Sequence, residues 1–189
     1  MKIFIYLILF LPFSLDLKAQ SATSIPPSAY DSLKSSNLKP LDKKKEGYFL
    51  KKDGKGNLLR EGFLVNLNLE GKERSYYETG ALLTETDYKK NKKNGWMVYY
   101  TIEGTVTSIY SLKEDKMHGP YQEFVDGKLF LEGFYLNGEK DGKQRIFRKG
   151  VISEQGNFVK GKKEGVWETY DQKGKLLLKT TWKNGVEVK

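Results

Sequence analysis

Glycine recurs at a fixed interval along most of this chain, and this spacing constrains the fold more than any other feature of the sequence. One series is spaced 24, 24, 24, 23 and 23 residues apart and consists of Gly47, Gly71, Gly95, Gly119, Gly142 and Gly165. A second series follows eight or nine residues after each of these and consists of Gly56, Gly80, Gly104, Gly127, Gly150 and Gly174. Self-similarity at one period is the signature of a repeat architecture. The spacing therefore predicts a repeat domain over residues 47–189.

Apolar residues follow the same period. An aromatic residue stands five residues after the first glycine in five of the six units, as Tyr76, Tyr100, Phe124, Phe147 and Tyr170. Lys52 takes this place in the first unit. Apolar residues also recur eight residues after the second glycine, as Leu64, Tyr88, Leu112, Tyr135, Phe158 and Trp182. Because each unit is too short for two helices, these columns favour strands.

The pattern inside each unit is that of a β-hairpin. In the fourth unit, Leu129, Leu131, Gly133 and Tyr135 alternate with Phe130, Glu132 and Phe134. Alternation of this kind buries one face of a strand and leaves the other largely wet. Turn signals include Asn94-Gly95, Asp126-Gly127, Asn137-Gly138, Lys149-Gly150, Lys173-Gly174 and Asn184-Gly185. We predict an all-β fold, an elongated twisted antiparallel meander of about six hairpins and about twelve strands.

One point of strand geometry stays open. Trp167 and Tyr170 lie two and five residues after the first glycine of the last unit, so their positions have opposite parity. This predicts either a bulge in the first strands or aromatic side chains on both faces of the sheet.

The first nineteen residues have the pattern of a secretory signal peptide. Lys2 precedes an apolar run from Ile3 to Phe13, and Ala19 is a small residue at the expected cleavage point. This run is too short to span a hydrocarbon core of roughly 30 Å. Residues 20–46 are rich in serine, proline and lysine, and we expect a flexible linker there. The mature protein is expected to be exported, periplasmic or extracellular, and soluble.

Composition excludes several kinds of chemistry. The chain has no cysteine and one histidine, which excludes a thiolate zinc site, an Fe–S cluster and a multi-histidine metal site. We expect no metal and no cofactor. A catalytic triad would have to use His118, but other units carry Glu70, Asn94, Asp141 and Glu164 at the same position. A column of unlike polar residues is typical of turns, so we interpret His118 as a turn residue.

Glutamate recurs at one position of the second strands. The column consists of Glu61, Glu85 and Glu132, and Gln155 continues it. Equivalent positions in successive hairpins are about 9.6 Å apart, which is near the carboxylate separation of inverting glycosidases. The column is broken elsewhere, and no insertion forms a pocket around it. We therefore expect a solvated face balanced by lysines, and we expect no enzyme.

The net charge is +9, and lysines gather in the links between units. These are Lys89, Lys90, Lys92, Lys93, Lys113, Lys116, Lys140, Lys160, Lys162 and Lys163. Successive links of a meander emerge at one edge, so a basic stripe is expected, with Lys92, Lys93, Lys162 and Lys163 as candidate contacts for an anionic ligand. Alternatively, the lysines protect loops and edges against aggregation, and neighbouring acids dilute their charge. Nucleic acid is not an expected partner of an exported protein.

Two blocks carry a resemblance to a known family. Residues 95–106 read GWMVYYTIEGTV, residues 165–176 read GVWETYDQKGKL, and the link 158–165 reads FVKGKKEG. These blocks resemble the MORN repeat, in a bacterial variant that also occurs in proteins of the YwqK antitoxin type. The resemblance covers roughly residues 47–188. It implies a twisted antiparallel sheet that acts in protein contact or, in eukaryotic relatives, in binding anionic lipid.

Together these observations predict an exported, non-enzymatic β-repeat scaffold that binds another protein. The candidate contact residues are Trp96, Tyr100, Tyr121, Phe124, Trp167 and Tyr170. The alternative is a binding module for anionic lipid or an envelope polysaccharide, through the lysine stripe and exposed aromatic rings. The same rings are needed for packing between units, so their burial would count against a contact role.

Overall fold

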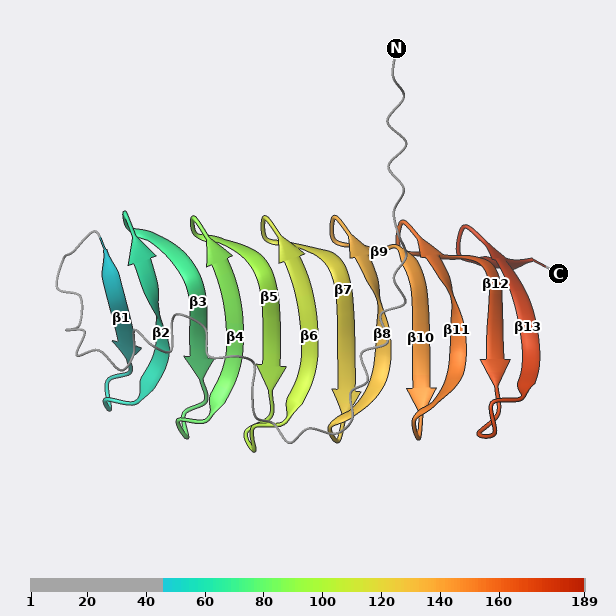
Figure 1. Ribbon diagram of the computed structural model, residues 1–189, viewed down its shortest axis with the longest axis horizontal. Helices are drawn as coiled ribbons and strands as arrows, with labels where there is room; N and C mark the ends of the chain where they lie inside the picture. Colours follow the sequence, from blue (N-terminus) through green and yellow to red (C-terminus); the bar gives the residue numbers. More distant parts are fainter. Residues whose placement is uncertain (1–45, 189) are drawn as a thin grey trace, which may run out of the picture.

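The computed structural model describes residues 46–188, which form one open antiparallel sheet of fourteen strands and no helix. The strands follow one another in chain order, side by side along the long axis of the molecule (Figure 1). They are β1 Gly47–Lys52, β2 Leu58–Val65, β3 Asn68–Tyr76, β4 Leu82–Lys89, β5 Lys92–Tyr100, β6 Val106–Lys113, β7 Lys116–Val125, β8 Lys128–Leu136, β9 Glu139–Lys140, β10 Gly142–Arg148, β11 Val151–Val159, β12 Lys162–Tyr170, β13 Leu176–Lys183 and β14 Val186–Val188. The predicted all-β meander is confirmed.

The strands make up six hairpins and two short additions. The hairpins are β1–β2, β3–β4, β5–β6, β7–β8, β10–β11 and β12–β13. The two additions are β9, which is separated from β10 by Asp141, and β14, which pairs with the last three residues of β13. The segment predicted as a signal peptide, and the predicted linker except for Glu46, lie outside the described residues.

Most predicted turns close a hairpin or a link. Both residues have positive φ in Asp126-Gly127, Asn137-Gly138, Lys149-Gly150 and Asn184-Gly185, as two-residue hairpin turns require. The prediction of a turn at Asn94-Gly95 is wrong, because both residues lie inside β5. The adjacent turn is formed by Lys90 and Asn91, whose φ angles are 50° and 66°.

Gly95 lies instead at a break in strand register. Thr86 pairs with Met97 and Tyr88 with Lys93, so β5 has two more residues than β4 between these pairs. Gly95 is in the extra stretch and has a φ of 129°. The same shift occurs between β2 and β3, β6 and β7, and β11 and β12. Four glycines of the first series, Gly71, Gly95, Gly119 and Gly165, thus mark irregular, bulge-like positions inside strands rather than turns.

Aromatic side chains occupy both faces of the sheet. The hydroxyl of Tyr170 donates a hydrogen bond to Glu168 over 2.6 Å, so these side chains lie on one face. Trp167 precedes Glu168 in the strand and points to the opposite face. A register shift is also present beside Tyr170, since Thr169 pairs with Leu178 and Tyr170 with Leu176. The extra residue of this shift, Leu177, is in β13, so aromatic side chains on both faces, and not a bulge in the first strand, account for the opposite parity of Trp167 and Tyr170.

Candidate interaction surface

One row of side chains crosses the whole sheet, one residue from each long strand. The register pairs place in order Leu50, Glu61, Arg74, Glu85, Val98, Ile109, Gln122, Glu132, Arg145, Gln155, Glu168 and Lys179. We call this row the ladder row, and the face that carries it the ladder face. The expected glutamate column is part of it.

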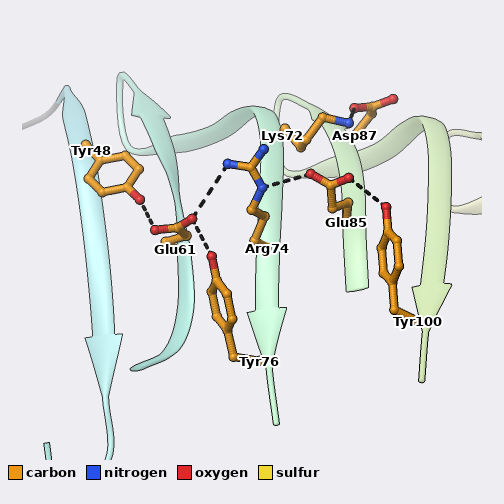
Figure 2. A network of polar contacts seen from close by, with 8 residues as sticks. All are labelled: Tyr48, Glu61, Lys72, Arg74, Tyr76, Glu85, Asp87 and Tyr100. Atoms are coloured by element: carbon orange, nitrogen blue, oxygen red, sulfur yellow. Dashed lines mark hydrogen bonds and ion pairs between the residues drawn. The ribbon is translucent and has the colours of Figure 1, made fainter. Parts of the chain in front are cut away.

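A buried ionic cluster lies near the first end of the ladder row, next to Leu50. Glu61 is fully buried and Glu85 is 6% exposed. Arg74 lies between them, with Nη1 3.7 Å from a Glu61 oxygen and Nε 2.8 Å from a Glu85 oxygen (Figure 2). One cation thus neutralises two carboxylates. For these two glutamates, the prediction of a solvated face balanced by lysines is wrong.

Tyrosines complete this cluster and account for its burial. Tyr48 and Tyr76 both donate hydrogen bonds to Glu61, the second over 2.5 Å, and Tyr100 donates to Glu85 over 2.9 Å (Figure 2). Burial, with the Glu85 carboxylate nearby, raises the pKa of Tyr100 well above its usual value. The aromatic column five residues after the first glycine therefore includes rings that shield the carboxylates.

From Glu132 onward, the ladder row is partly open to solvent. The Arg145 and Glu132 side chains form an ion pair of 2.7 Å and are 42% and 26% exposed. The Lys179 and Glu168 side chains pair over 2.9 Å and are 56% and 24% exposed. This part of the sheet has the solvated polar face that the sequence predicts.

The opposite face buries large rings against small residues, and we call it the ring face. Tyr121 is 2% exposed and Trp167 3% exposed. Tyr121 lies beside Gly133, where a Cβ would stand 2.8 Å from the ring, and Trp167 lies over Gly156. Neighbouring rings extend this packing, because the Tyr121 and Tyr135 centroids are 4.7 Å apart. A sheet one layer thick thus protects rings from water by pairing them with glycine.

The six predicted contact rings divide between the two faces. Tyr121 and Trp167 are taken up by packing on the ring face. The other four lie on the ladder face, where Trp96 is 46% exposed and Tyr100, Phe124 and Tyr170 are half-buried.

An exposed row of apolar residues runs beside the ladder row on the same face. Each member stands two residues before or after a ladder residue in its own strand, and they are Trp96, Pro120, Phe134 and Val166. We call them the apolar row. Trp96, Phe134 and Val166 are 46%, 52% and 51% exposed. Of these, the sequence analysis found only Trp96. The sequence signal for the exposure of Phe134 was that it alternates with Gly133, a residue of the buried face.

The links between units lie together at one edge of the sheet, as expected (Figure 1). Each link bonds to the one before it. For example, the Asn91 N–H donates to the Leu69 carbonyl, and the Asp115 N–H donates to the Lys93 carbonyl. The carboxylate of Glu70 also accepts the Lys90 N–H. These bonds hold neighbouring links in register at this end of the strands.

His118 belongs to the same column as Glu70, and the interpretation of this column as turns is wrong. His118 lies inside β7, with Nδ1 3.3 Å from Asn137 Oδ1 of the next link. Asp141 and Glu164 accept the N–H groups of Lys160 and Asn184 in the same way. Glu70, His118, Asp141 and Glu164 thus each connect one link to the next, and different polar side chains serve this role.

The four candidate lysines are not equivalent. Lys92 and Glu114 form an exposed ion pair of 2.5 Å. The Lys93 ammonium is 3.7 Å from the Met97 sulfur. Lys163 lies over the rings of Trp167 and Trp182, 3.9 and 4.8 Å from their centroids, and pairs with Glu154. Lys162 is exposed and has no ion pair with another described residue.

No group of three or more histidine, aspartate or glutamate side chains within residues 46–188 is placed to hold a metal ion. The same range contains no helix of the length and apolarity that a membrane span requires. Neither a comparison with protein-family models nor a search of curated proteins found a match. What the fold itself defines is an open β-hairpin meander.

Proposed function

We propose that this protein is an exported, non-enzymatic scaffold of MORN-like β-hairpins whose ladder face binds another protein. The apolar row is the observation that carries the proposal. Trp96, Phe134 and Val166 have about half of their surface in water. Pro120 and Phe134 stand opposite each other in this row, and a contiguous apolar exposure on a protein surface marks an interaction site.

The surroundings of the apolar row favour a protein as the partner. Ser111 separates Trp96 from Pro120, and Lys143 and Asn157 lie between Phe134 and Val166 along the row. The exposed Glu132–Arg145 pair runs alongside. Aromatic residues beside polar groups and a charged rim are the composition of protein interfaces.

The test is crosslinking of the tagged protein in cells, followed by mass spectrometry of what co-purifies. We expect one dominant protein partner, and we expect the double variant Phe134→Ser and Val166→Ser to lose it. Val125→Ser is the matched control, because Val125 is 55% exposed and lies outside the apolar row. Equal capture by the double variant and the wild type would contradict the proposal.

A second candidate function is binding of anionic lipid or an anionic polysaccharide. The observation in its favour is the link from Lys89 to Lys93, which places four lysines within five residues and, among residues 46–188, has one ion pair, between Lys92 and Glu114. Vesicles containing anionic phospholipid would then bind the protein, and binding would weaken steeply with salt. Neutralising Lys92 and Lys93 should abolish this binding, and the same changes at Lys162 and Lys163 provide the comparison.

A further inference from the structure

Three consecutive leucines of β13, the last long strand of the sheet, are exposed. Leu176, Leu177 and Leu178 are 40%, 62% and 56% exposed. β14 pairs only with Thr181, Trp182 and Lys183 of this strand. No strand within residues 46–188 pairs with the outer side of the segment Leu176–Thr180. Open backbone groups beside exposed leucines form a template for an added strand.

Inner junctions of the sheet show how such an edge is covered. Where β3 joins β2, Arg60 pairs with Ser75 and Glu61 with Arg74. Where β10 joins β8, Leu131 pairs with Ile146 and Glu132 with Arg145. The covered residues stand four and five positions after the second glycine of their unit. In β13 these positions are Leu178 and Lys179, so an added strand would pair first with these two residues.

The charge of the ladder row indicates what such a strand would carry. Neighbouring charged residues in the row have opposite signs throughout: Glu61, Arg74 and Glu85 in one part, Glu132 and Arg145 in another, and Glu168 and Lys179 at the end. Lys179 closes the row with its side chain 56% exposed. An acidic residue opposite Lys179 on an added strand would continue this alternation of charge. Cross-strand pairs of opposite charge stabilise a sheet.

We propose that β13 binds an extended segment of another protein by strand addition, with an aspartate or glutamate opposite Lys179 and apolar residues against Leu177 and Leu178. This site is separate from the apolar row, and it rests on the proposed function only in that the partner is a protein.

A second copy of this chain fits the edge less well. In the repeat register, β1 of that copy would take the added position, which places Leu50 opposite Lys179 and Lys51 opposite Leu178. Lys52 would follow, where other units have an aromatic ring. This arrangement places Lys51 and Lys52 of the second copy near Lys179, and it provides no carboxylate to pair with Lys179.

The probe is a labelled peptide with the sequence GVWETYD, that of residues 165–171. In the sheet this segment pairs with β11 through Thr169 opposite Glu154 and Glu168 opposite Gln155. On β13 the same register places the peptide glutamate opposite Lys179. The control is the peptide with lysine in place of glutamate. Fluorescence anisotropy against the purified full chain measures binding of both.

We expect the glutamate peptide to bind at least tenfold more tightly than the lysine peptide. Leu178→Ser should weaken binding several-fold, whereas Val125→Ser should not. Lys179→Glu should reverse the preference between the two peptides, and circular dichroism checks that each variant is folded.

Equal binding of the two peptides, or no effect of Leu178→Ser, would overturn the proposal. So would sedimentation that shows a dimer of the wild type and a monomer of Leu178→Ser, because a second copy would then be the occupant. Capture of a cellular partner that needs Phe134 and not Leu178, together with no peptide binding, would leave the scaffold function standing and remove the edge site.

Discussion

The indole ring of Trp167 lies over Gly156, so closely that a methyl group on this glycine would overlap the ring. Trp167 is 3% exposed as a result, although no second layer of described residues covers the sheet. The same relationship joins Tyr121 to Gly133. Other folds bury their large side chains under a second layer of structure. This sheet buries them by packing the largest side chains against the smallest residues.

The first prediction concerns these glycines. Gly156→Ala and Gly133→Ala should each lower the free energy of unfolding by about 1–3 kcal/mol, because the ring must move off its rotamer. Urea denaturation followed by tryptophan fluorescence measures this. Gly54→Ala is the control, since a Cβ at Gly54 meets nothing within 4 Å. Equal stability of all three variants would show that the rings do not depend on the glycines.

The buried ionic cluster gives a second prediction. Replacing Arg74 by Met leaves Glu61 and Glu85 buried around an uncharged side chain, which should cost about 3–5 kcal/mol of unfolding free energy. Arg145→Met breaks a solvent-exposed pair and should cost less than about 1 kcal/mol. Thermal or urea unfolding of the two variants separates these values. Similar losses of unfolding free energy in the two variants would mean that burial of the Arg74 cluster does not increase the cost of removing its cation.

Tyrosine ionisation provides a third prediction, at alkaline pH. Burial, with the Glu123 carboxylate beside it, raises the pKa of Tyr110 to about 12. Burial and Glu73 do the same for Tyr88. The unfolded chain releases these protons near pH 10, so their contribution to stability is complete below pH 10 and is lost as the pH rises to about 12. Ultraviolet absorbance of tyrosinate should show a late-titrating fraction that disappears in denaturant.

A fourth prediction concerns acid. The hydrogen bond from Tyr170, with those from Lys179 and Gln155, lowers the pKa of Glu168 to about 2 from 4.5. The stabilisation by this network is therefore present above pH 4.5 and is lost as the pH falls towards 2. In Tyr170→Phe, the carboxyl carbon of Glu168 should titrate at higher pH by NMR. An unchanged titration curve would assign the shift to the other two partners.

Local patterns predicted the hairpins because turn chemistry and alternation act within a few residues. Asp126-Gly127 and Asn184-Gly185 form turns for this reason. Asn94-Gly95 has the same residue types but lies inside β5, because Gly95 is one of the extra residues where the register with β4 shifts. Nothing in the dipeptide itself distinguishes the two uses.

By itself the sequence determined the repeat, its six hairpins, their order and the edge at which the links gather. These features follow from periods of two and of about 24 residues along one chain. The tertiary structure alone decided which side chains are buried. Trp96 and Trp167 stand one and two residues after a first glycine, but Trp96 faces Ser111 and is exposed, whereas Trp167 covers Gly156. Burial of a side chain depends on the residue that faces it on the neighbouring strand. The register shifts decide which residue that is, and the spacing of residues in the sequence does not predict them.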